Sequence, residues 1–332
     1  MPRAPGFWAA DGGGGLSALL TPVLAPVLAP LAAIVAAVTA RRLARPGWHA
    51  PVPVLCVGNA TVGGAGKTTV ALDLAARLRD LGCAPHVLLR GYGGAARGVR
   101  RVAPDDPAAL VGDEALLLAA VAPTWVGADR AATARAACAA GAGVLVMDDG
   151  LQNPGLHKDV SLLVIDGGFG FGNGRVLPAG PLREPVAAAA ARCTAAVLIG
   201  QDLHAARAVL PPGLPVLGAR LEPGPEAATL AGQRVFAFAG IARPEKFFAS
   251  LRQAGAVLAG SESFPDHHAF APRTIARLLT RAAQLDAVPV TTAKDAVRLP
   301  PEVRAVVRVL GVRLAWEDPA AIAALLIRLT RG

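Results

Sequence analysis

The sequence predicts an α/β protein with two α/β domains of unequal size and a membrane helix at its N-terminus. Short hydrophobic runs alternate with Ala-rich helical stretches along most of the 332 residues, which is typical of a mainly parallel sheet covered by helices. A Pro- and Gly-rich stretch at 211–232 separates this region from a second α/β unit. We therefore predict a membrane-associated segment and basic linker at 1–50, a larger domain at 51–215 and a smaller second α/β domain at 216–332.

The segment Leu16–Ala40 has no charged residue, and Arg41 and Arg42 follow it directly. It is long enough to enter or span a hydrocarbon layer of about 30 Å. Basic residues after such a segment place the following domain on the cytoplasmic side of the membrane. Three prolines each remove a backbone hydrogen bond, so both a spanning helix and a kinked, interfacial one fit the sequence. These prolines are at positions 22, 26 and 30.

The remaining elements follow from short apolar runs. In the larger domain we expect strands at 54–57, 87–89, 143–147, 162–165 and 196–199, and a helix at 67–81. In the second domain we expect strands at 235–239 and 288–291.

The charge of the chain limits its partners. The net charge is +9, and almost all of the basic excess is Arg. An anionic membrane surface, phosphorylated substrates or nucleic acid would each attract such a chain. No zinc-finger spacing, RNA-binding signature or aromatic platform accompanies the charge, so we expect no nucleic-acid partner. The four isolated cysteines indicate reduced, buried positions, and the sequence indicates no obligate protein partner.

The motif with the most chemical content is VLCVGNATVGGAGKTT at 54–69. A strand leads into a glycine-rich loop that opens a helix, so that backbone N–H groups and the helix N-terminus converge on phosphate oxygens. This pattern predicts a P-loop NTPase-like α/β/α sandwich that binds ATP and Mg²⁺, although Thr61 stands where the strict pattern has Gly. The predicted nucleotide-binding residues are Gly63, Gly64, Ala65, Gly66, Lys67, Thr68 and Thr69.

A P-loop needs a second Mg²⁺ anchor at the end of a neighbouring strand. Asp148 and Asp149 follow the apolar run 143–147 and supply hard oxygen ligands. With the hydroxyl of Thr68, these carboxylates are the predicted metal ligands.

Two further polar groups have a structural and a functional interpretation. Asp113 and Glu114 precede an apolar helix, where an N-cap is the structural alternative. Residues 265–268 contain adjacent histidines, for which a surface loop is the alternative. In the functional interpretation, a carboxylate and an imidazole from these two places deprotonate an acceptor hydroxyl.

Together these motifs resemble the tetraacyldisaccharide 4′-kinase family of the lipid A pathway. The order of the motifs along one chain makes the resemblance specific. The matching stretches are 57–59, 63–68, 90–94, 112–114, 148–152, 177–185, 238–245, 264–268 and 291–298. The sequence departs from the family pattern at Leu89, Thr69, Asn153 and Ala293, none of which has a predicted catalytic role.

The resemblance implies an ATP-dependent kinase with its active site in a cleft between two α/β/α domains. By this resemblance, Lys67 binds the phosphates of ATP. Asp113, assisted by His267, is the base that deprotonates the 4′-hydroxyl of the acceptor. The acceptor is an acylated glucosamine disaccharide 1-phosphate at the cytoplasmic face of the bacterial inner membrane. Gln152 is expected near the nucleotide. The residues expected to bind the lipid substrate are Tyr92, Arg183, Asp266 and His268.

A P-loop ATPase switch that docks on membranes is the main alternative to a kinase. Residues 62–69 resemble the phosphate-binding loop of that ATPase superfamily. The extra signature lysine of the superfamily is absent, however, and Val62 stands in its place.

Overall fold

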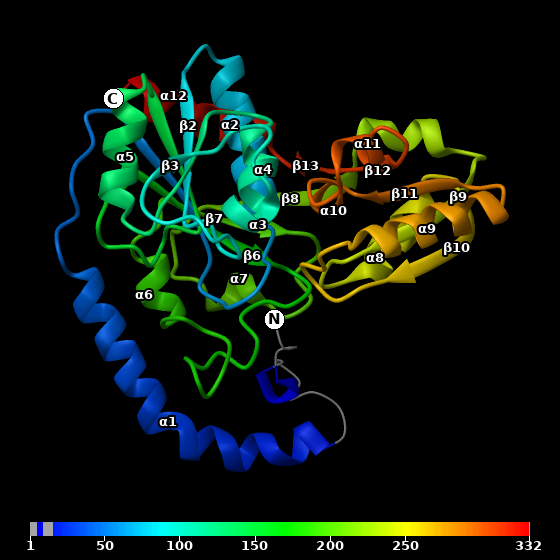
Figure 1. The fold of residues 1–332 in the computed structure, drawn as a ribbon. Coiled ribbons are helices and arrows are strands. Elements are labelled where there is room, and N and C mark those ends of the chain that lie inside the picture. The colour runs from blue at the N-terminus through cyan, green and yellow to red at the C-terminus, as the bar shows by residue number, and fades with distance from the viewer. Residues whose placement is uncertain (1–4, 9–15, 332) are drawn as a thin grey trace.

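The computed structural model describes residues 5–8 and 16–331, and Figure 1 shows a larger and a smaller α/β unit with a long helix beside the larger one. Every strand expected from the sequence is present, as is the expected helix, with ends shifted by no more than two residues. The predicted α/β class is confirmed.

The larger unit is built on a nine-stranded sheet, ordered β13-β8-β7-β6-β1-β5-β2-β4-β3. Its strand β1 lies between β5 and β6 and is parallel to both, so that Val57 pairs with Asp148. Central strands that are buried on both faces explain why they read as unbroken apolar runs. The strands are β1 Val54–Gly58, β2 Pro85–Leu89, β3 Arg100–Arg101, β4 Thr124–Val126, β5 Val144–Asp148, β6 Val160–Asp166, β7 Ala195–Ile199, β8 Val216–Pro223 and β13 Val312–Trp316.

Helices cover both faces of this sheet. Helix α2 begins directly after the glycine-rich loop and buries Val70 and Leu74 against the sheet. The helices of this unit are α2 Lys67–Asp80, α3 Ala108–Val111, α4 Asp113–Ala119, α5 Arg130–Ala139, α6 Val186–Ala190, α7 Ala206–Val209 and α12 Pro319–Arg331.

The smaller unit has a parallel four-stranded sheet, ordered β10-β9-β11-β12, with apolar clusters on both faces. Its strands are β9 Arg234–Ala239, β10 Val257–Ser263, β11 Val288–Thr292 and β12 Arg308–Leu310. Its helices are α8 Pro244–Gln253, α9 Pro272–Gln284, α10 Ala293–Ala296 and α11 Pro301–Arg304, preceded by the 3₁₀ helix η2 Pro225–Leu230.

The smaller unit is an insertion between two strands of the larger sheet. Strands β8 and β13 pair antiparallel, from Pro223 opposite Val312 to Ala219 opposite Trp316. With β13 the chain returns to the larger unit, where α12 then packs into the same core as α2. The sequence-based division assigned all of 216–332 to the second domain, whereas the sheet pairing gives 216–223 and 312–331 to the first. Strand β8 was not predicted, because it lies within the Pro- and Gly-rich stretch 211–232, whose composition is typical of a linker.

Helix α1, Leu16–Leu43, contains the predicted apolar segment, and Figure 1 shows that it is bent. Bending follows from its prolines, because each leaves one carbonyl without its helical donor. Its window Pro26–Leu43 has a mean hydropathy of 1.5 and is long enough to cross a membrane. One face packs on the larger unit through Ala32, while large apolar side chains face outward. These are Val27, Leu31, Ile34 and Val38, each more than half exposed.

The return of the chain to the first core predicts the effect of a substitution in α12. Leu326 is fully buried in the cluster shared with α2. We expect Leu326→Ala to lower the free energy of unfolding by about 2–5 kcal/mol, because it removes buried methyl groups and leaves a cavity. Urea denaturation followed by circular dichroism measures this change. The matched control is Leu203→Ala at a side chain that is 61% exposed, for which we expect less than about 0.5 kcal/mol. Equal effects of the two substitutions would contradict the assignment of α12 to this core.

Candidate active site

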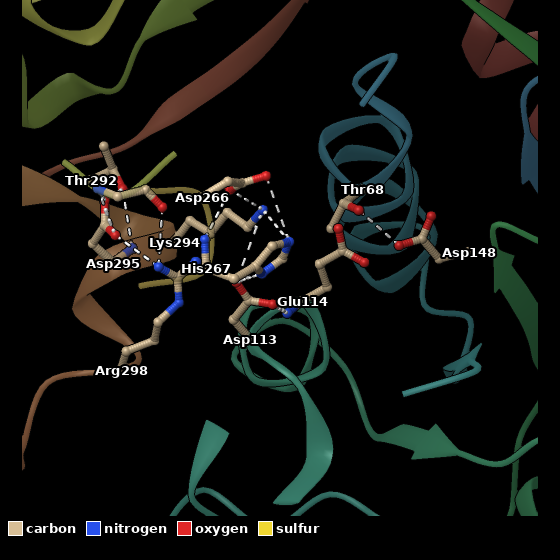
Figure 2. A network of polar contacts seen from close by, with 11 residues as sticks. Thr68, Asp113, Glu114, Asp148, Asp266, His267, Thr292, Lys294, Asp295 and Arg298 are labelled. Atoms are coloured by element: carbon tan, nitrogen blue, oxygen red, sulfur yellow. Dashed lines mark hydrogen bonds and ion pairs between the residues drawn. The ribbon is translucent and has the colours of Figure 1, made fainter. Parts of the chain in front are cut away.

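The candidate site lies where loops at the carboxyl ends of parallel strands from the two sheets meet. In the larger unit, the glycine-rich loop follows β1 and Asp149 follows β5. In the smaller unit, the loop with His267 follows β10 and α10 follows β11. Ligands of open α/β sheets bind outside the carboxyl ends of the strands, where loops carry the functional groups. Figure 2 shows side chains from both units converging in this region.

The glycine-rich loop has the backbone conformation that its sequence predicts. Gly63 and Gly66 have φ angles of 111° and 86°, a region that side chains with a Cβ rarely adopt. A Cβ on Gly66 would also lie 2.7 Å from Ile199 Cδ1. Helix α2 begins at Lys67, directly after the loop. The Nζ of Lys67 donates a hydrogen bond to Asn59 Oδ1 at 3.0 Å.

A second segment braces this loop from outside. Val62 N donates to Pro181 O at 2.8 Å, and Arg183 N donates to Ala60 O at 2.7 Å. The proline-rich stretch 177–185 therefore holds the glycine-rich loop in place through these two backbone hydrogen bonds. Thr69 is partly buried in the first turn of α2.

The predicted metal ligands Thr68 and Asp148 are in contact. The Thr68 hydroxyl donates to Asp148 Oδ2 at 2.9 Å. Asp148 Oδ1 is buried and has no hydrogen-bond partner among the described residues. Burial and the nearby Glu114 carboxylate raise the pKa of Asp148 to about 7. A buried oxygen without a donor, close to a second carboxylate, fits a cation that occupies this place.

Glu114 is a candidate ligand that the sequence interpretation missed. Its carboxyl lies between the Asp113 side and the Thr68–Asp148 pair in Figure 2, and burial raises its pKa. Within the described residues, no three His, Cys, Asp or Glu side chains form a complete metal cage. This is the pattern expected for Mg²⁺, which takes one or two carboxylates, substrate phosphates and water. The position of Glu114 directly after Asp113, in the first turn of α4, was the available sequence signal.

Asp149 has a different environment from its neighbour Asp148. The backbone of Asp149 has a left-handed φ of 52°. Its side chain contacts two cations, Lys67 and Arg183. Lys67 Nζ lies 3.7 Å away and Arg183 donates twice, at 2.9 and 3.2 Å. Burial opposes ionisation of Asp149, but Lys67 and Arg183 outweigh it and lower its pKa. Asp149 is therefore a charged partner of Lys67.

Gln152 connects this group to a buried anion. Its amide donates to Asn59 O and to Glu184 Oε1, both at 2.9 Å, and its oxygen accepts from Arg183 at 3.3 Å. Arg192 in turn donates to both oxygens of Glu184 at 2.8 Å. The structure thus places Gln152 and Arg183 together on the side of the glycine-rich loop. The network also includes Asn59 and Glu184, to which the sequence interpretation gave no role.

Asp113 and His267, which are 154 positions apart in the sequence, meet between the two units. Asp113 Oδ2 lies 3.0 Å from His267 Nδ1. Asp113 Oδ1 accepts the backbone N–H of Glu114 at 3.0 Å, so one oxygen satisfies the start of α4 while the other faces the second unit. The N-cap of α4 is Gly112 and no side chain caps it, so the N-cap interpretation of Asp113 is wrong. His267 has a left-handed φ of 60°, which is uncommon for a residue with a side chain.

Two cations from the second unit approach the same carboxylate. Arg298 Nη2 donates to Asp113 Oδ2 at 2.5 Å, and Lys294 Nζ lies 3.9 Å from it. Burial opposes ionisation of Asp113, but the Arg298 hydrogen bond and the charges of Lys294 and His267 together lower its pKa. Neither cation was among the predicted site residues. Their motif, 291–298, was noted for its resemblance, but its spacing gives no indication of what they contact.

Arg298 is held rigidly from its own side. Its Nη1 donates to Asp295 Oδ1 at 2.9 Å and to Gly240 O at 3.2 Å. Asp295 is fully buried, and both of its oxygens accept from the backbone N–H of Gly240. The guanidinium therefore links a fixed point of the second unit to Asp113 of the first.

The other predicted substrate residues surround His267. Asp266 Oδ1 accepts the backbone N–H of His267 at 3.1 Å, and the Tyr92 ring centroid lies 6.5 Å from that of His267. His268 faces elsewhere, since its ring stacks on Phe264 at 4.6 Å and packs edge-on against Phe270 at 5.1 Å. Of the two adjacent histidines, His267 is the one that faces Asp113.

Known proteins share both the sequence and the fold. A model of the family described as tetraacyldisaccharide-1-P 4′-kinase matches residues 24–330. The tetraacyldisaccharide 4′-kinase of Gluconacetobacter diazotrophicus is 60% identical over 320 residues, which are 96% of this chain and 95% of the relative. That of Rhodospirillum centenum is 55% identical over 337 residues, covering 99% of this chain and 97% of the relative.

Among solved structures, the crystal structure described as the "apo" form of LpxK from Aquifex aeolicus in complex with ATP has a TM-score of 0.75 and 25% sequence identity. The match covers 92% of this chain and 99% of that one. Sequence, fold and the order of the motifs agree, and the chain belongs to the tetraacyldisaccharide 4′-kinase family.

Proposed function

We propose that this kinase transfers the γ-phosphoryl group of MgATP to the 4′-hydroxyl of an acylated glucosamine disaccharide 1-phosphate in lipid A biosynthesis. The observation that supports the proposal is that the Asp113–His267 pair faces the Thr68–Asp148 pair in Figure 2. Phosphoryl transfer needs a phosphate-binding side and a hydroxyl-activating side that face each other.

The nucleotide side consists of the glycine-rich loop and its acidic partners. Lys67 and the loop amides would bind the β- and γ-phosphates, as they do in other P-loops. Thr68, Asp148 and Glu114 would hold Mg²⁺, which supplies neutralisation of phosphate charge when bound. Asp149 keeps Lys67 and Arg183 in place, and Gln152 fixes Arg183 relative to the loop.

The acceptor side consists of Asp113 and His267. A carboxylate whose pKa is lowered by cations is a weak base towards a sugar hydroxyl. Asp113 therefore serves mainly to orient and charge-stabilise the imidazole, and His267 takes up or relays the proton. Tyr92 and Asp266, which flank His267, would contact the sugar.

The apolar face of α1 supports attachment to the membrane that contains the substrate. Val27, Leu31, Ile34 and Val38 project outward, and Arg41 and Arg42 are in the last turn of the helix. An apolar face followed by arginines fits the cytoplasmic face of the bacterial inner membrane, where anionic lipids attract basic residues. The cleft would then meet an acceptor too apolar to diffuse through water.

Replacement of the loop lysine tests the nucleotide side. We expect Lys67→Ala to lower kcat by at least about 10²–10³-fold, because it removes a preorganised donor to the phosphates. Transfer of labelled γ-phosphate to acylated disaccharide 1-phosphate in detergent measures the effect, and circular dichroism checks that the fold is intact. Appreciable residual transfer would refute the role of Lys67. Release of free phosphate by the unaltered protein at the same rate with and without lipid would instead favour an ATPase switch.

Replacement of the histidine tests the acceptor side. We expect His267→Ala to lower kcat by about 10²–10⁴-fold with little change in KM, because general-base catalysis acts in the transition state. His268→Ala is the matched control, since its ring packs against Phe264 and Phe270, and we expect a smaller effect on kcat. A change in KM alone for His267→Ala would count against a role in proton transfer.

The exposed face of α1 tests membrane attachment. Val38→Asp places a charge on this face, at a side chain that is 62% exposed, and we expect it to weaken binding to anionic vesicles. A charge at the centre of a membrane helix costs about 2.5–3.5 kcal/mol. Val306→Asp is the matched control, at a side chain that is 58% exposed in the second unit. Vesicle co-sedimentation with phosphatidylglycerol-containing liposomes measures both, and equal loss of binding would contradict the assigned face.

A further inference from the structure

Lys294 is a cation of the second unit whose side chain lies beside His267 and Asp266 in the candidate site (Figure 2). Its Nζ lies 3.4 Å from His267 Nε2, 3.4 Å from Asp266 Oδ1 and 3.9 Å from Asp113 Oδ2. All three neighbours belong to the acceptor side of the cleft. The ammonium is therefore close to the place where an acceptor hydroxyl must bind.

The contacts of Lys294 leave it free to bind an additional anion. Its three distances are long for charge-assisted hydrogen bonds, and 26% of its side chain is exposed. Arg298, by contrast, makes contacts of 2.5 and 2.9 Å and is 7% exposed. The guanidinium is committed to Asp113 and Asp295, whereas an ammonium can turn its three donors towards a new acceptor.

The position of Lys294 also places it near the phosphate side. In Figure 2, Glu114 lies between the Asp113–His267 pair and the Thr68–Asp148 pair. Burial raises the pKa of Glu114, and among the charges that lower this pKa that of Lys294 has the largest effect. The charge of Lys67 acts on the same carboxyl. Reacting atoms must approach within about 3–3.5 Å before transfer. A phosphorus atom next to a hydroxyl held by His267 is therefore within reach of Lys294.

Composition gives an independent reason to single out this residue. The chain has 33 basic residues, and four of them are Lys, at positions 67, 158, 246 and 294. In a chain that otherwise uses Arg, the charges of two of these lysines, Lys67 and Lys294, act on the same carboxyl, that of Glu114. A compact, rotatable ammonium suits a single phosphate oxygen better than a planar fork that would bind Asp266 or Asp113 bidentately.

We propose that Lys294 is a further catalytic residue, which donates to an oxygen of the phosphoryl group while that group passes between the two sides of the cleft. The inference rests on the proposed roles of Lys67 and the Asp113–His267 pair. In the transfer, the bond from phosphorus to the β–γ bridging oxygen breaks and the acceptor oxygen bonds to phosphorus. The hydroxyl proton goes to the Asp113–His267 pair, and ADP leaves. Charge on the oxygens in transit is then balanced from both domains.

The test replaces the charge and keeps the apolar stem. Lys294→Met, Lys294→Arg and the control Lys246→Met, at an exposed lysine of α8, are compared with the unaltered protein. Calorimetry measures the binding of ADP and of ADP with aluminium fluoride, a mimic of the phosphoryl group in transit, both with Mg²⁺ and the disaccharide acceptor. Transfer of labelled γ-phosphate gives kcat and KM for ATP.

We expect Lys294→Met to bind ADP normally, to lose the additional affinity for the aluminium fluoride mimic, and to lower kcat by about 10²–10³-fold with little change in KM for ATP. Lys294→Arg should recover part of both losses, and Lys246→Met should behave as the unaltered protein. Equal losses for ADP and for the mimic, or retention of kcat in Lys294→Met, would overturn the assignment. Lys67→Ala, measured alongside, tests the nucleotide side separately. An active Lys67→Ala refutes the proposed phosphate site, whereas an inactive Lys67→Ala beside an active Lys294→Met refutes the present inference alone.

Discussion

The arrangement of the two units depends on a buried carboxylate. Asp113 is 4% exposed and belongs to the first unit; it is paired with Arg298 and Lys294 of the second unit and contacts His267. An unpaired charge in such a place costs about 3–5 kcal/mol relative to the intact pair. The same contacts that neutralise Asp113 bring His267 into the cleft. The contacts that stabilise the buried charge of Asp113 therefore also hold His267 beside it.

The Asp148–Asp149 pair illustrates how environment separates two identical side chains. Asp149 turns towards Lys67 and Arg183, whose charges outweigh burial and lower its pKa. Asp148 stays at the end of β5, buried beside Glu114, with a raised pKa and one oxygen lacking a donor among the described residues. Neighbouring groups with divergent pKa values are typical of functional sites. One aspartate organises the loop, and the other has room for a cation.

Each unit is held together by its own sheet, whereas few elements connect the two units. The first sheet holds the glycine-rich loop through β1 and a brace from 177–185, so the phosphate side is fixed before any ligand binds. The second unit is connected to it through the antiparallel strands β8 and β13 and is fastened across the cleft by polar contacts. Polar interfaces between domains permit relative motion more readily than large apolar ones. Each unit can therefore be rigid by itself while the two units move relative to each other.

The sequence by itself determined the fold class, the glycine-rich loop, the apolar N-terminal helix and the identity of most polar residues at the site. These features have local causes: glycines set the loop conformation, apolar runs set the strands, and Lys67 and Thr68 follow the loop at a fixed spacing. Only the tertiary structure decided that 216–223 and 312–331 belong to the first unit, that His267 and not His268 faces Asp113, and that Lys294 and Arg298 enter the site. Strand order, side-chain direction and contacts between residues separated by 100 or more positions depend on how the two sheets are placed, and no local pattern encodes that placement.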